Sequence, residues 1–175
     1  MFFKEIDVEK ILEKLKDDKK LQVLWNKKKI DIFLDYDNFE NEIDEIRKKL
    51  ETLKLLVENS EEWDKKIKDA AGEYILEDAQ DWWEPSADYE DEDMPGLIED
   101  LAEFVGKEEA ENMVNNEELS LKAFKKLLYV SSIRLNENGD FEVALFDIDE
   151  LIFGGHIMFV FGNINGEFVS GNFAG

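Results

Sequence analysis

Residues 129–148 read YVSSIRLNENGDFEVALFDI, and this stretch decides the fold class. Its two halves, residues 129–135 and 141–148, are rich in β-branched, aromatic and apolar residues, a composition typical of strands. Between them lies the pair Asn138-Gly139, which favours the left-handed backbone of a tight hairpin turn. The sequence therefore predicts two antiparallel strands joined through residues 136–139.

Further strands are predicted on both sides of this hairpin. Residues 157–161 are apolar throughout, which predicts a central strand covered by helices. The polar run 163–166 then turns the chain into a final strand at 167–169. Near the other end, residues 21–34 predict a second hairpin around the polar turn 26–29.

The middle of the chain has helical periodicity. Apolar residues recur at spacings of three and four, which predicts helices over 6–15, 43–57, 59–83, 97–105 and 121–128. Residues 108–118 are expected to form another short helix or an ordered loop. Asn59 with Glu62 fits a capping box, and Ser120 fits an N-cap. Strands at both ends with helices between them predict a mostly antiparallel sheet, packed with several helices, in the α+β class. We expect a single domain over 1–175, with the acid-rich segment 84–118 as a possible insertion.

The charge is strongly negative and unevenly distributed. The chain has 44 Asp and Glu against 21 Lys and Arg, a formal net charge of −23. Residues 61–118 alone contain 22 acidic and 4 basic residues, a net charge of −18. Such a field repels nucleic acid and anionic membranes, so we expect neither as a partner. A basic protein is the partner that this charge favours, and general solubility is the alternative explanation.

Several classes of chemistry lack the residues they need. The chain has no cysteine and a single histidine, and no apolar stretch approaches a membrane span. We therefore expect a cytoplasmic protein without disulfides or a cofactor. His156, near Asp147, Asp149 and Glu150, could act as a base or a metal ligand, but no second histidine or cysteine is available to complete a zinc site. We expect no enzyme activity, no catalytic residue and no metal.

The pair Trp82-Trp83, beside an acidic run, is the most suggestive binding feature. A helical stripe from Trp63 through Ile67 to Trp82 places Trp82 in the core, so Trp83 projects away from the stripe and is expected to be partly exposed, with packing under the acidic loop as the alternative. Aromatic residues among acids are typical anchors of protein interfaces. The predicted partner-binding residues are Trp83, Glu84, Asp88, Tyr89, Glu90, Asp91, Glu92 and Asp93, with Glu99 and Asp100 as further candidates.

The last third of the chain resembles a bacterial family known as domain of unknown function 2262. The resemblance rests on the run from Asp147 to Ile157 with Gly154-Gly155-His156, on Gly162-Asn163, and on the final Ala174-Gly175. The helix that begins at Trp63-Asp64 and the short helix with Phe124 match in order, whereas segment 84–118 departs from the family pattern. The resemblance brings no catalytic residue.

Charge and resemblance together predict an immunity protein, because small acidic proteins of this general kind often neutralise toxins encoded beside them. The expected partner is a basic toxin domain, such as a nuclease, bound through the acidic surface and its aromatic anchors. Two alternatives remain open from the sequence: a small enzyme or metal-dependent protein with a site around His156, Asp147 and Asp149, and a regulatory protein-binding module.

Overall fold

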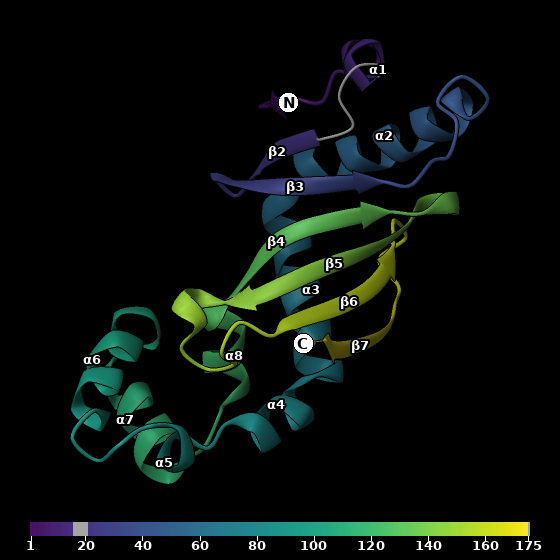
Figure 1. Ribbon diagram of the computed structural model, residues 1–175. Coiled ribbons are helices and arrows are strands. Elements are labelled where there is room, and N and C mark those ends of the chain that lie inside the picture. Colours follow the sequence, from purple (N-terminus) through teal and green to yellow (C-terminus); the bar gives the residue numbers. More distant parts are fainter. Residues whose placement is uncertain (16–20, 175) are drawn as a thin grey trace.

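The computed structural model describes residues 1–15 and 21–174, with only the backbone of Asp88, Phe173 and Ala174 (Figure 1). The strands are β1 (Phe2–Phe3), β2 (Leu21–Trp25), β3 (Lys28–Leu34), β4 (Leu128–Leu135), β5 (Asp140–Asp147), β6 (Ile157–Asn163) and β7 (Phe168–Ala174). The helices are α1 (Val8–Leu15), α2 (Ile43–Glu58), α3 (Ser60–Tyr74), α4 (Leu76–Trp82), α5 (Pro85–Asp88), α6 (Met94–Val105), α7 (Lys107–Asn116) and α8 (Leu121–Leu127). Within the described residues, no helix is long and apolar enough to cross a membrane.

The seven strands form one mixed sheet in which spatial order equals sequence order. β2–β3 and every pair from β4 to β7 are antiparallel, whereas β1–β2 and β3–β4 are parallel. The parallel β3–β4 pair joins the two ends of the chain, with Leu34 opposite Leu135. The predicted α+β class is confirmed, with a sheet built from N- and C-terminal strands and helices from the middle. The two parallel junctions were not predicted.

Both predicted hairpins are present, and their turns explain the sequence signal. Asn138 and Gly139 have φ values of 59° and 83°, so both residues adopt left-handed backbone between β4 and β5. Asn26 and Lys27, with φ values of 44° and 70°, form the corresponding turn between β2 and β3. Left-handed pairs match the right-handed twist of the flanking strands, which is why short hairpins favour them.

The helices cover one face of the sheet (Figure 1). α2 packs against β2 and β4, and α3 packs against β6 and β7. The apolar stripe of α2 is fully buried at Ile46, Leu50 and Leu53, as its periodicity predicted. Burial of such a stripe removes apolar surface from water, which is the main stabilising contribution to packing of this kind.

The opposite face of the sheet is open, which corrects one expectation. In β6 the buried residues Met158 and Val160 alternate with the half-buried Phe159 and Phe161. The prediction that helices cover residues 157–161 therefore holds for one face of β6, which α3 contacts, and not for the other. The error has a physical reason, because a half-exposed aromatic residue on an open face is as apolar in sequence as a core residue.

The long helix predicted over 59–83 is bent into α3 and α4. Hydrogen bonds continue across the bend, from Ile75 N–H to the Ala71 carbonyl and from Ala79 N–H to the Ile75 carbonyl. The backbone of Ile75, at φ −122° and ψ −21°, nevertheless departs from helical values and changes the direction of the axis. The predicted capping box is absent, since the side chain of Asn59 donates instead to the Leu55 carbonyl.

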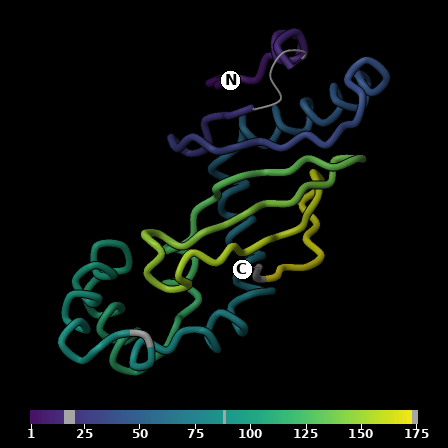
Figure 2. Tube along the Cα trace, in the orientation of Figure 1, coloured from purple at the N-terminus to yellow at the C-terminus, as the bar shows by residue number. Residues whose placement is uncertain are grey.

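Helices α5, α6 and α7 form a lobe at one end of the molecule. Figure 2 shows this lobe at the opposite end from α1, with α4 and α8 leading to and from it. We use "acidic lobe" for these three helices together with α4 and the short segment after α7, that is, for residues 76–118. Ser120 caps α8 as predicted, because its hydroxyl oxygen accepts a hydrogen bond from the Ala123 N–H at 3.1 Å.

Candidate functional site

The acidic lobe carries most of the charge of the protein. Its residues 76–118 include 17 Asp and Glu but only one basic residue, Lys107, a net charge of −16. Lys107 is paired with Glu111 at 3.7 Å. Apart from Asp88, whose side chain lies outside the described residues, the remaining acids of the lobe make no ion pair with any residue that the structure describes. Their negative field is therefore directed to solvent, because no internal cation neutralises it.

Three side-chain hydrogen bonds join α4 to the far end of the acidic lobe and to the residue that follows it. The Gln80 amide donates to the Glu117 carbonyl at 2.8 Å and accepts from the Leu119 N–H at 2.6 Å. The indole N–H of Trp83 donates to the Met113 carbonyl at 2.9 Å, which ties α4 to α7. Buried or half-buried hydrogen bonds of this kind fix an orientation because breaking one leaves a polar group unsatisfied.

The two neighbouring tryptophans have the opposite roles from those predicted. Trp83 is only 2% exposed, whereas Trp82 is 48% exposed. The interface anchor predicted at Trp83 is therefore corrected, because a buried ring offers a partner no surface. Trp82 is the exposed member of the pair, and its ring contacts the His156 ring edge-on, with centroids 4.5 Å apart.

Trp82 lines a hollow of about 360 Å³ between α4 and the turn before β6. Asp81, Ile152, Phe153, Gly154 and His156 complete its lining. The burial of Trp83 rather than Trp82 had a signal in the sequence that the predicted stripe did not use. Ile67, Ala71, Ile75, Ala79 and Trp83 are each four residues apart, and all are buried.

The other predicted partner-binding residues lie on the lobe with different degrees of exposure. The acidic members are exposed: Glu84, Glu90, Asp91, Glu92, Asp93, Glu99 and Asp100. The side chain of Asp88 lies outside the described residues. Tyr89 is half-buried, and its hydroxyl donates to the Leu151 carbonyl at 3.3 Å. Tyr89 thus ties the lobe to the turn after β5, with part of its ring left at the surface.

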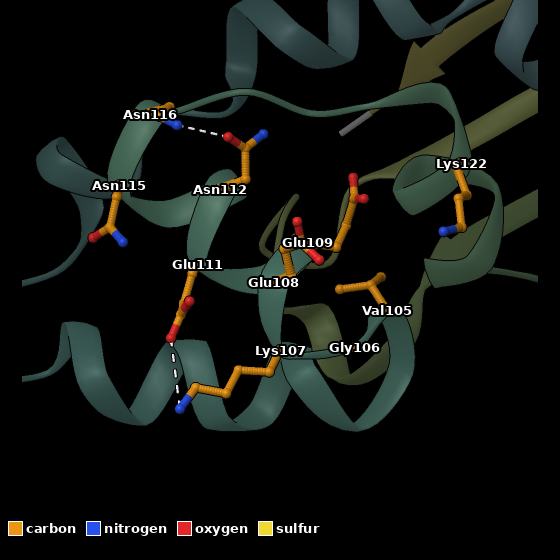
Figure 3. Close-up of a pocket in the computed structure, with 10 residues that line it drawn as sticks. All are labelled: Val105, Gly106, Lys107, Glu108, Glu109, Glu111, Asn112, Asn115, Asn116 and Lys122. Atoms are coloured by element: carbon orange, nitrogen blue, oxygen red, sulfur yellow. Dashed lines mark hydrogen bonds and ion pairs between the residues drawn. The ribbon is translucent and has the colours of Figure 1, made fainter.

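A second hollow, of about 680 Å³, opens beside α7 (Figure 3). Glu108, Glu109 and Glu111 line it together with the amides of Asn112, Asn115 and Asn116. Lys122 reaches into it from α8, across from these residues. Small-molecule pockets are mostly apolar, so this polar, open lining suits the surface of a charged protein better than a small ligand.

The carboxylates near His156 do not converge on it. Asp147 is buried and accepts the Ile152 N–H at 2.7 Å, so its carboxylate closes the turn after β5. Burial raises the pKa of Asp147, while hydrogen bonds from the Ile152 and Phe153 backbone act in the opposite direction. Asp149 and Glu150 are exposed. Among the described residues, no three acidic or histidine side chains are grouped closely enough to hold a metal ion.

One family model matches this chain. The model is that of DUF2262, described as an uncharacterized protein conserved in bacteria, and it matches residues 9–173. The chain belongs to the DUF2262 family. No curated protein and no solved structure matches it. The resemblance seen over part of the sequence thus extends over nearly the whole DUF2262 chain, and the match spans the acid-rich segment 84–118 as well.

Proposed function

We propose that this DUF2262 protein is an immunity protein that binds and neutralises a basic bacterial toxin domain, such as a nuclease, in the cytoplasm. One observation supports the proposal above the others. The net charge of −16 lies on one lobe, and an exposed tryptophan, Trp82, lies at its base. If the negative charge served solubility alone, we would expect it to be spread over the surface and not concentrated in 43 of 175 residues.

The lobe is suited to speed up association with a basic partner. Unpaired carboxylates on one lobe produce a directed field, and such fields raise association rates by about 10- to 1,000-fold at low salt. The carboxylates then occupy positions on a nuclease domain that otherwise hold substrate phosphates. Inhibition in this scheme needs no chemistry from the immunity protein, which is why we propose binding without catalysis.

The Trp82 hollow is suited to slow dissociation. An Arg or Lys side chain of the toxin that enters it meets the exposed ring of Trp82 and the carboxylate of Asp81. Cation–π contacts of this type contribute about 0.5–2 kcal/mol, depending on how far water is excluded. The ring is already held against His156, so little side-chain freedom is lost on binding.

The test uses the protein encoded by the gene next to that of this DUF2262 protein. This candidate toxin domain is expressed, and its association rate with the DUF2262 protein is measured by stopped flow at about 50 and about 300 mM salt. We expect association to slow strongly as salt rises, and toxicity in bacteria to be suppressed by co-expression. Trp82→Ala is expected to raise the dissociation rate and to change the association rate little.

Matched charge variants locate the effect on the lobe. The triple variant Asp91→Asn, Glu92→Gln and Asp93→Asn removes three exposed charges from the lobe. A control triple, Glu5→Gln, Glu13→Gln and Glu40→Gln, removes three exposed charges elsewhere. Only the lobe triple is expected to slow association. The proposal would be contradicted by an association rate that does not change with salt, or by equal effects of the two triple variants. It would also be contradicted if the neighbouring gene encodes a harmless or acidic protein.

A further inference from the structure

A cluster of lysines lies on α3 and α8 in this otherwise acidic protein. Between residues 55 and 133 the chain has seven basic residues, and five of them line one hollow of about 510 Å³. Lys65 and Lys68 come from α3, and Lys122, Lys125 and Lys126 come from α8. Residues almost 60 positions apart in the sequence are thus brought together by the packing of α3 against α8.

The hollow has a net positive charge. Asp64 lies in its lining and is paired with Lys68 at 2.9 Å, and Asp69 is paired with Lys125. The carboxylate of Asp64 also accepts a hydrogen bond from the indole N–H of Trp25 at 3.0 Å. In the described part of the chain, the three other lysines, Lys65, Lys122 and Lys126, make no ion pair. All three are exposed.

The hollow also has an apolar surface, which comes from Leu121. Leu121 is 47% exposed at the first position of α8. It packs on α3 where Gly72 has no side chain, because a Cβ at this position would clash with Leu121 Cδ1 and lie 3.7 Å from Lys125 Cδ. The stems of the lysines add further methylene groups around it.

From this combination we propose that the lysine hollow is a second binding site, which takes an acidic segment of another protein that inserts an apolar side chain. The carboxylates of the segment pair with Lys65, Lys122 and Lys126, and its apolar side chain packs on Leu121. Charge complementarity selects this occupant, since a basic segment meets five ammonium groups and a simple anion leaves Leu121 exposed. The site borders the acidic lobe, because Lys122 also lines the hollow beside α7, but the proposal does not depend on the toxin-binding function.

The test uses the full-length protein and a short fluorescein-labelled peptide of alternating Glu and Asp with two Leu residues. Binding is followed by fluorescence anisotropy at about 150 mM salt, where charges more than about 8 Å away are largely screened. Two control peptides replace the acids with Gln and Asn, or the Leu residues with Ser. We expect the acidic Leu-containing peptide to bind and both controls to bind markedly less.

Variants of the protein place the peptide in the hollow. Exposed ion pairs each change affinity about two- to threefold, so the double variant Lys122→Gln and Lys126→Gln should weaken binding about fivefold. The control double variant, Lys4→Gln and Lys10→Gln, removes the same charge from exposed positions near α1 and should change nothing. Leu121→Asn should weaken binding of the Leu-containing peptide but not of the Ser-containing peptide.

Three results overturn the proposal. The first is no binding, or binding that is equal for the two double variants. The second is full competition by inorganic phosphate together with equal binding of the Ser peptide, which indicates a simple anion site. The third is a dimer of the protein alone that the Lys122 and Lys126 substitutions dissociate in sedimentation experiments, which makes a second copy the occupant. Circular dichroism of each variant verifies that it is folded.

Discussion

The two adjacent tryptophans allow a sharp test of the structure. Trp83→Ala removes a ring that is 2% exposed, and Trp82→Ala removes a ring that is 48% exposed. A buried Trp covers about 150–250 Å² of surface, which at about 25 cal/mol per Å² corresponds to about 4–6 kcal/mol as an upper bound. Trp83→Ala is therefore expected to cost about 4 kcal/mol, and Trp82→Ala about 2 kcal/mol or less.

The hydrogen bond of Trp83 adds a second, separable effect. Its indole N–H is bound to the Met113 carbonyl at 2.9 Å inside the protein. Trp83→Phe keeps an aromatic ring but leaves that carbonyl without its donor, at a cost of about 1 kcal/mol in addition to the smaller ring. The expected order of stability is wild type, then Trp82→Ala and Trp83→Phe, with Trp83→Ala the least stable.

The assay is urea unfolding followed by far-ultraviolet circular dichroism, since Trp25 and Trp63 complicate fluorescence. With a slope of about 2 kcal/mol per molar urea, a loss of about 4 kcal/mol moves the midpoint by about 2 M. Trp82→Ala should move it by about 1 M or less. A Trp82→Ala variant as unstable as Trp83→Ala, or less stable, would refute the assignment of the two rings.

Two further predictions concern Asp147 in β5 and Gly171 in β7, the second with Gly96 in α6 as its control. Burial raises the pKa of Asp147 above its ordinary value of 3.8, so ionisation of its carboxyl lowers the stability of the folded state as the pH rises from 3.8 through the folded pKa, and the loss is complete above that pKa. Asp147→Asn should therefore be more stable than wild type near pH 7 in thermal melts, with the difference shrinking as the pH falls toward 3.8; a constant difference, or an equal one for the exposed Asp149→Asn, would be inconsistent with this. Gly171→Ala places a Cβ 2.7 Å from Ile75 Cγ1 and 3.2 Å from the Phe159 carbonyl, and should lower stability by about 1–3 kcal/mol in urea titrations. Gly96→Ala, which meets no atom within 4 Å in helix α6, should instead be neutral or stabilising by up to about 1 kcal/mol, and a loss at Gly96 equal to that at Gly171 would remove the steric explanation.

Much of the fold was accessible from the sequence because it rests on local patterns. The Asn138-Gly139 turn, the stripe of α2 and the Ser120 cap each depend on residues a few positions apart. The parallel β3–β4 pairing was not accessible, because it joins strands about 100 residues apart and no local pattern records it. The open face of β6 was missed for a related reason, since aromatic residues suit both a core and an open sheet face.

The candidate site divides in the same way. The concentration of acids in one segment is a property of the sequence, and the structure places those acids at the surface of one lobe. Which tryptophan accompanies them depends on the bend at Ile75, because a change of axis direction there alters which side of α4 faces the core. A spacing of four from Ile67 to Trp83 was present in the sequence, but only packing decides between two overlapping stripes.

The sequence by itself determined the α+β class, the strands and most helices, and the uneven charge. These follow from composition and from interactions between near neighbours, which operate before any tertiary contact forms. Only the tertiary structure decided that Trp82 is exposed and Trp83 buried, that Asp147 is desolvated, and that five lysines from two helices share one hollow. Each of these depends on distances between segments far apart in the chain, and such distances are set by the packing of the whole core.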